Sequence, residues 1–265
     1  MRAFACDLDR TLIGQDAVLR PRTIAAIAAA RARGIHVIVV TGRMFRSVRP
    51  YVQEAGLDEP VICYQGAVVA DPVSGRFLLH IPIPLGLAKE AIGAVEDAGF
   101  GLNCYVGDQL YVAEVTDWAR AYADFQHLPI EAVGDLRSWL REPPTKLVAV
   151  GDPDALDVLQ ERMLERFAGR MYISKSLPYF LEFASPEVSK GSGLAFLAER
   201  LGFAAAETVA VGDGENDREL LEWAGYAVCV EESHPSLFEL ADLVIPGPES
   251  DGVADLIESY LDLAA

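Results

Sequence analysis

Short apolar runs rich in β-branched residues alternate along this chain with stretches of helical periodicity. Residues 2–6 form the first apolar run, and residues 35–40 form a second with the length and composition of a buried strand. Between them, residues 21–33 show a helical pattern with Pro21 in the first turn and Gly34 just past the end, the usual order of helix signals. This alternation predicts an α/β fold with a doubly wound parallel sheet wrapped by helices.

The pattern is interrupted in the middle of the chain. Pro82 and Pro84 bracket a linker, after which a self-contained set of helical and strand-like stretches begins. The first pattern resumes after Pro186. We therefore predict a sheet domain made of residues 1–81 and 186–265, with a smaller α/β cap, residues 82–185, inserted into it.

Charge and composition narrow the classes of partner. The net charge of −18 argues against sequence-independent binding of nucleic acid, because such binding needs clustered Lys and Arg. A divalent cation is a more suitable partner for an acidic chain. The four cysteines form no CxxC pair and lie mostly in apolar runs, so we expect reduced core residues. The chain shows neither a signal leader nor an apolar run of about 18 residues. We expect a cytoplasmic monomer or weak homodimer with no membrane or nucleic-acid partner.

Two carboxylates directly follow the first apolar run, at Asp7 and Asp9. Residues i and i+2 of an extended chain point the same way, so both can serve one small site. One carboxylate can attack phosphorus while bound to a metal, and the other can donate a proton to the leaving oxygen and later take one from water. Alone, this spacing is more often a metal pair or a solvated turn.

A second motif, Thr41, Gly42 and Arg43, ends the run 35–40. A hydroxyl group and a free backbone N–H can bind phosphate oxygens there, and glycine allows close approach. By itself the motif is equally compatible with an ordinary turn.

Two further motifs open predicted helices. Lys190 stands where the helix dipole disfavours a cation, so either it is simply exposed or an anionic partner lies nearby. Residues 212–217 (GDGEND) offer hard oxygen ligands for an ion such as Mg²⁺, although Asp217 could equally be a helix N-terminal residue favoured by the dipole. All four motifs lie at strand ends or helix starts, where open α/β sheets gather their ligands.

Taken together, the order and placement of these motifs resemble the haloacid dehalogenase superfamily of phosphatases, in particular its Cof-like branch with a large α/β cap. The resemblance implies a Rossmann-like core and Mg²⁺-dependent hydrolysis of a small phosphomonoester through a phospho-aspartyl intermediate on Asp7. It implies that Asp9 is the general acid/base, that Thr41 and Lys190 hold the phosphoryl group, and that Gly42, Arg43 and Asn216 lie near the substrate. The implied metal site consists of Asp7, the Asp9 carbonyl, Asp213 and a supporting Asp217.

The chain departs from the family pattern at three places. Arg10 stands where relatives usually have glycine, so it is either merely exposed or directed toward the cap and an anionic part of the substrate. Gln65 replaces a frequent Asn, and residues 231–235 form a bulkier, more acidic loop than usual. Arg43, Arg46, Lys175 and Tyr179 are candidate substrate contacts, although Arg46 could equally be a solvated helix residue and Tyr179 an ordinary strand aromatic.

Two other functions remain open from the sequence. A phosphomutase would return the phosphoryl group to another hydroxyl group rather than to water. A receiver-like signalling domain also combines acidic residues, Thr, Lys and Mg²⁺, but typically needs only about 120 residues and has no cap. Sugar phosphates are the first substrates to expect, followed by phosphoglycolate-like acids and flavin or pyridoxal phosphates.

Overall fold

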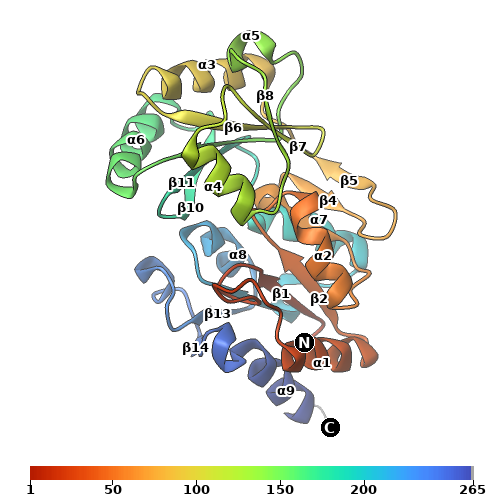
Figure 1. Ribbon diagram of the computed structural model, residues 1–265. Helices are drawn as coiled ribbons and strands as arrows, with labels where there is room; N and C mark the ends of the chain where they lie inside the picture. Colours follow the sequence, from red (N-terminus) through yellow and green to blue (C-terminus); the bar gives the residue numbers. More distant parts are fainter. Residues whose placement is uncertain (264–265) are drawn as a thin grey trace.

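The computed structural model describes residues 1–263 and contains two β-sheets, one above the other in Figure 1. The larger sheet has the strand order β14-β13-β12-β1-β2-β3-β4-β5. It is parallel from β14 to β3, and the remaining two strands form an antiparallel edge. Its strands are β1 (Ala3–Asp7), β2 (His36–Val40), β3 (Val61–Cys63), β4 (Val68–Ala70), β5 (Phe77–His80), β12 (Thr208–Gly212), β13 (Tyr226–Val230) and β14 (Leu243–Ile245).

Helices cover both faces of this sheet, which confirms the predicted doubly wound architecture. Alternation along β1 explains the two layers, because successive side chains of a strand point to opposite faces. Phe4 and Cys6 pack in one apolar cluster with α1 (Pro21–Ala32), α2 (Phe45–Glu54) and α9 (Gly252–Leu263). Ala3 and Ala5 pack in a second cluster with α7 (Lys190–Leu201) and α8 (Arg218–Trp223).

The direction of winding reverses beside β1. From β1 the chain proceeds to β2 and β3 on one side, whereas β12, β13 and β14 extend the sheet on the other side. Such a switch point leaves a crevice at the carboxyl ends of the strands, which is the usual ligand position in open α/β sheets. β1 ends in that crevice at Asp7, and β12 leads directly into Asp213.

The smaller sheet is built entirely from the chain between β5 and α7. Its order is β10-β11-β9-β6-β7-β8, and its pairs are antiparallel except β7 with β8. Its strands are β6 (Gly101–Val106), β7 (Gln109–Val112), β8 (Ile130–Ala132), β9 (Lys146–Val150), β10 (Tyr172–Leu177) and β11 (Phe180–Ala184), and its helices are α3 (Leu85–Glu96), α4 (Asp117–Phe125), α5 (Leu136–Trp139) and α6 (Pro153–Arg166).

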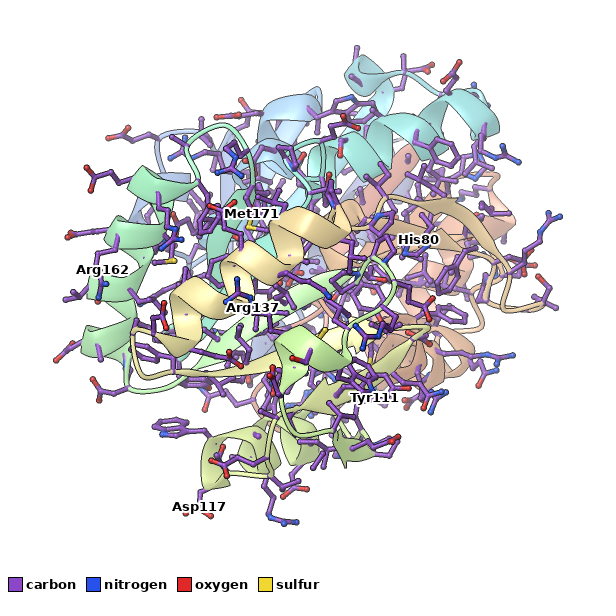
Figure 2. All side chains as sticks on the ribbon, turned by 90° about the horizontal axis from the view of Figure 1, so that it is seen from above. His80, Tyr111, Asp117, Arg137, Arg162 and Met171 are labelled. Atoms are coloured by element: carbon purple, nitrogen blue, oxygen red, sulfur yellow. The ribbon has the colours of Figure 1, made fainter. Side chains whose placement is uncertain are left out.

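The helices of this smaller unit divide between its two faces. Leu102 and Cys104 of β6 pack outward against α3 and α6, which lie over the sheet in Figure 2. Tyr105, one residue further along, points the other way and packs with Tyr122 of α4. The sheets thus use the residue ranges that the sequence assigned to them, while the division into two domains stays a prediction.

The sequence did not predict five of the observed elements, which are α2, α9 and the short strands β5, β8 and β14. The helix expected from Asn216 begins only at Arg218, because residues Glu215–Asp217 form a separate turn of 3₁₀ helix. The four cysteines are free and buried, as expected. Among the described residues, no helix is long and apolar enough to cross a membrane.

The loop between β3 and β4 has an unusual backbone. Tyr64, Gln65 and Gly66 have φ angles of 53°, 59° and 99°, so three successive residues lie in the left-handed region. A Cβ atom on Gly66 would lie 2.0 Å from the backbone oxygen of Ser189, the residue that caps α7. Only glycine therefore lets this loop pack against the start of α7.

We predict that Gly66→Ala destabilises the fold by about 3 kcal/mol or more, because left-handed strain adds to a clash with backbone. The matched control is Gly34→Ala, where φ is 76° but no atom lies within 4 Å of the added Cβ. That variant should lose only about 1 kcal/mol. Urea denaturation measures both free energies of unfolding, and equal losses would contradict the packing argument.

Candidate active site

Asp7 and Lys190 form the buried centre of the crevice. Asp7 is the last residue of β1, and Lys190 is the first residue of α7. The Lys190 Nζ atom lies 2.5 Å from Asp7 Oδ1 and 2.5 Å from Asp217 Oδ1. Lys190 is 1% exposed, so its anionic partners explain why a cation stands at a helix N-terminus.

The helix start is fixed by a reciprocal cap rather than by Lys190. The Ser189 hydroxyl accepts a hydrogen bond from the Ser192 backbone N–H, and the Ser192 hydroxyl lies 2.9 Å from the Ser189 nitrogen. This is the geometry of a capping box with serine in place of the usual Glu. The Lys190 side chain is therefore left free to cross the crevice toward β1.

Charges inside this cluster are unbalanced. Burial raises the pKa of Asp7 well above its ordinary value, and Asp217, Asp213 and Asp9 raise it further while Lys190 opposes them. Burial disfavours the charged form of Lys190, but Asp217 and Asp7 outweigh it and raise the Lys190 pKa. One ammonium group thus faces several carboxylates, and a further cation would relieve their repulsion.

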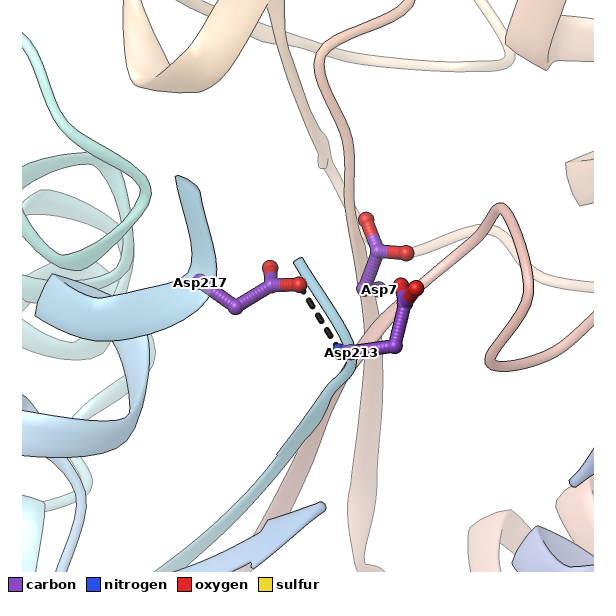
Figure 3. A group of neighbouring side chains, drawn as sticks. All are labelled: Asp7, Asp213 and Asp217. Atoms are coloured by element: carbon purple, nitrogen blue, oxygen red, sulfur yellow. Dashed lines mark hydrogen bonds between the residues drawn. The ribbon is translucent and has the colours of Figure 1, made fainter. Parts of the chain in front are cut away.

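Three of these carboxylates are close enough to share an ion. One oxygen each from Asp7, Asp213 and Asp217 lies within 4.8 Å of the others, as Figure 3 illustrates. Burial, followed by the charge of Asp217, raises the pKa of Asp213 to about 7. Buried carboxylate oxygens are the hard ligands that Mg²⁺ prefers, so the donor set fits a metal ion.

Asp217 differs from the other two carboxylates. Its Oδ1 atom accepts from Lys190, and its Oδ2 atom accepts from the backbone N–H groups of Asp213 (3.0 Å, dashed in Figure 3) and Gly214 (2.9 Å). Asp7 and Asp213 line the cavity of the site, whereas Asp217 does not. The geometry suits Asp217 as a support for the Asp213 loop and leaves Asp7 and Asp213 to meet a ligand.

Asp9 is held away from Lys190 by a different cation. Arg43 donates from Nε to Asp9 Oδ2 at 2.8 Å and from Nη2 to Asp9 Oδ1 at 2.6 Å. The buried guanidinium also lies between the rings of Tyr51 and Phe125, 5.3 and 5.2 Å from their centroids. Phe125 ends α4 of the smaller unit, so this ion pair is covered by both units.

The phosphate-binding candidates surround Asp7. Thr41 directly follows Val40, the partner of Asp7 in the β1–β2 register, and its hydroxyl accepts from the Arg43 backbone N–H at 3.1 Å. The Asn216 amide donates to Gln65 Oε1 at 3.0 Å, and it lines the cavity together with Gly42. The structure therefore brings the residues of all four sequence motifs to one edge of the large sheet.

A buried ion pair of the smaller unit was not predicted. Lys146 Nζ donates to Glu182 Oε2 at 3.0 Å and to the Gly42 carbonyl at 2.7 Å. Gln65 donates to the same Glu182 oxygen at 2.9 Å, so the pair joins β9 and β11 to the large sheet. The available signal was a charged residue within each of two otherwise apolar strands, because such residues are rarely buried without a partner.

The cavity enclosed by these groups is small. Its volume is about 30 Å³, which is room for roughly two water molecules. The large sheet contributes Asp7, Asp9 and Asp213, and the smaller unit contributes Phe125, Ser176, Leu177, Phe180 and Glu182 to its lining. The structure thus represents a closed arrangement of the two units.

Other expected substrate contacts lie elsewhere. Arg46 lines a separate groove near Phe77, and Tyr179 packs on Phe180 without lining the cavity. Lys175 lines a second groove next to the site. Of the two alternatives for Arg10, the structure shows a 37% exposed side chain whose Nη2 atom donates to the Glu232 carbonyl of the large sheet domain at 3.2 Å.

Comparison with known proteins identifies the family of this chain. A family model of haloacid dehalogenase-like hydrolases matches residues 4–257. The chain is 28% identical over 269 residues to the pyridoxal phosphate phosphatase YbhA of Escherichia coli, covering 98% of each chain. It is 29% identical over 257 residues to a phosphoglycolate phosphatase of Archaeoglobus fulgidus, covering 97% of this chain and 96% of the relative.

Solved structures give the same result. A Thermotoga maritima protein superposes with a TM-score of 0.82 at 30% identity, and the match covers 97% of both chains. The resemblance found in the sequence is confirmed, since the family model spans nearly the whole chain. The protein belongs to the haloacid dehalogenase-like hydrolases.

Proposed function

We propose that the protein is a Mg²⁺-dependent phosphatase that hydrolyses a small phosphomonoester through a phospho-aspartyl intermediate on Asp7. The observation that carries this proposal is the position of the Asp7 carboxylate: it ends β1 at the switch point, held by Lys190 and lining the cavity. Relatives named as phosphatases over nearly their whole length support it. The family match over residues 4–257 argues against the receiver-domain alternative.

The chemistry assigns one step to each carboxylate of the first motif. An Asp7 oxygen attacks phosphorus, forming the acyl phosphate as the bond from phosphorus to the ester oxygen breaks. Asp9 supplies the proton that the leaving alkoxide takes up, and afterwards accepts a proton from the water that attacks the phospho-aspartate. That second attack breaks the bond to Asp7 and releases inorganic phosphate.

The Arg43–Asp9 pair must open during this cycle. Both Asp9 oxygens accept a hydrogen bond from the Arg43 guanidinium, so neither oxygen is free to reach a leaving oxygen or an attacking water while this pair is intact. Because Phe125 of the smaller unit covers Arg43, separation of the two units exposes the pair. We propose that residues 82–185 act as a cap whose movement admits the substrate and frees Asp9.

Asp7, Asp213 and the Asp9 carbonyl are the proposed metal ligands. When bound there, the ion would neutralise charge on the phosphoryl group during its transfer. Lys190 adds a fixed positive charge beside Asp7, and Thr41 and Asn216 orient the phosphoryl oxygens. Asp217 holds Lys190 and the Asp213 backbone in place.

We predict that Asp7→Asn lowers phosphate release by at least about a thousand-fold, because the amide is a poor nucleophile. The measurement is inorganic phosphate released from a panel of phosphomonoesters with Mg²⁺. Asp97→Asn, an exposed substitution at the end of α3, is the matched control and should keep wild-type rates. Equal rates for wild type and Asp7→Asn would remove the proposal.

The same assay separates the phosphatase from a phosphomutase. A phosphatase releases phosphate without added bisphosphate, since water is its acceptor. If phosphate release stays absent and phosphoryl transfer to a second hydroxyl group requires a bisphosphate activator, the mutase assignment replaces this one.

We predict that Mg²⁺ raises the melting temperature of the protein. At about one hundred times the dissociation constant, an ion that binds only the folded state contributes about 2.7 kcal/mol, which corresponds to several degrees in a chain of this size. Calorimetry should show this rise in the wild type and in Asp97→Asn but not in Asp213→Asn. An equal rise in Asp213→Asn would place the ion elsewhere.

A further inference from the structure

Arg10 occupies a backbone position that disfavours it. Its φ angle is 63°, in the left-handed region, and its N–H donates to the Ile13 carbonyl at 2.7 Å to close a tight turn. A residue with a side chain costs about 1–2 kcal/mol in this conformation, whereas glycine costs almost nothing. Strain of this kind at a site indicates that the side chain itself has a use.

The Arg10 guanidinium keeps free hydrogen-bonding capacity. One of its five N–H groups donates to the Glu232 carbonyl, and Nη1 lies 3.5 Å from Asp213 Oδ2. The side chain is 37% exposed, so its remaining donors face open space. The Glu232 carbonyl orients the guanidinium but, as a neutral acceptor, does not neutralise its positive charge.

The open space beside Arg10 is a groove that connects the site cavity with the surface. A groove of about 520 Å³ adjoins the small site cavity, and both share Arg10, Ser176, Leu177 and Asp213 as lining residues. Because the site cavity holds only about 30 Å³, the alcohol part of a substrate with its phosphoryl group at Asp7 must extend into the groove. It therefore passes Arg10.

Arg10 is the most weakly held cation on this path, because its contact with the Asp213 carboxylate is 3.5 Å long and its side chain is 37% exposed. Arg43, the other basic residue of the site cavity, is engaged by Asp9 through two hydrogen bonds. Lys175, further along the groove, is engaged by Asp157. In a chain of net charge −18, an anionic group entering the groove is repelled unless a local positive charge receives it.

We propose that Arg10 is a specificity-determining residue that selects phosphomonoesters carrying a second anionic group, a carboxylate or phosphate, on the alcohol part. The planar guanidinium matches either group with two parallel hydrogen bonds. This inference rests on the proposed phosphatase function and narrows its substrate class. It also explains why the position holds arginine despite the strain.

The test uses pairs of substrates that differ by one anionic group: 3-phosphoglycerate with glycerol 3-phosphate, and fructose 1,6-bisphosphate with fructose 1-phosphate. Wild type should prefer the anionic member of at least one pair in kcat/KM. Arg10→Gly, which also relieves the backbone strain, should reduce that preference by about ten- to a hundred-fold, the value of a charged hydrogen-bonded contact. The reduction should appear mainly as a higher KM for the anionic member.

Arg10→Lys, which keeps the charge but loses the planar fork, should retain part of the preference. Arg76→Gly is the matched control, because Arg76 is exposed in the β4–β5 turn and should leave the preference at the wild-type value. The Mg²⁺ concentration for half-maximal rate is measured with glycerol 3-phosphate and fructose 1-phosphate, which lack the second anionic group. A change in this concentration in the Arg10 variants reports on the contact of Arg10 with Asp213.

Two results overturn the proposal. One is a wild type that hydrolyses these esters without preferring any anionic member. The other is an Arg10→Gly variant whose kcat/KM falls by the same factor for both members of a pair while its Mg²⁺ dependence changes. That result would mean that Arg10 only supports the Asp213 loop. In both cases phosphate is still released, so the proposed phosphatase function survives; if wild type releases none from any ester, that function and the specificity fail together.

Discussion

The buried contact of Lys190 with Asp7 and Asp217 determines how the rest of the site can be built. Asp7 ends β1, Lys190 begins α7 and Asp217 ends the 3₁₀ turn before α8, and all three side chains are buried. Removing one partner of such a buried pair typically costs about 3–5 kcal/mol, because the other charge is left uncompensated. The contact therefore fixes where α7 meets β1, and it keeps the proposed nucleophile Asp7 beside a positive charge. Stability and chemistry depend here on the same atoms.

The two units also meet at the site through polar groups, beside an apolar cluster in which Tyr64 of the large unit packs on Tyr105 of the smaller one. Lys146 and Glu182 of the smaller sheet bind Gly42 and Gln65 of the larger one, and Phe125 closes over Arg43. Each of these contacts lies within or beside the cavity. The Lys146 and Gln65 contacts share the Glu182 carboxylate, and Gln65 also accepts from Asn216, so a change at one of these polar contacts acts on the others. The proposed movement of the smaller unit would therefore also reorder Asn216 of the site.

Sequence reasoning predicted the parts of this structure that follow from local pattern. The alternation of apolar runs located β1 and β2, and the motifs at strand ends located Asp7, Thr41 and Asp213. Short edge strands such as β8 and β14 carry too few residues for a recognisable period, and their pairing depends on neighbours distant in sequence. The Arg43–Asp9 and Lys146–Glu182 pairs join residues 34 and 36 positions apart, so no spacing rule could reveal them.

Arg10 illustrates how the structure changes the meaning of a residue that the sequence had only flagged. As a replacement for glycine it suggested a disturbed backbone and either an exposed side chain or a contact with the cap, whereas its guanidinium contacts Glu232 and Asp213 of its own domain. Those contacts hold a cation at the boundary between a cavity too small for a substrate and a groove large enough for one. In the proposed reaction the phosphoryl group lies at Asp7 and Lys190, so discrimination among substrates comes from groups that the alcohol part meets beyond them. Arg10 is the most weakly held positive charge on that path, because its contact with Asp213 is 3.5 Å long and its other partner is a neutral carbonyl, so the proposed phosphatase site also places a cation where a second anion would be recognised.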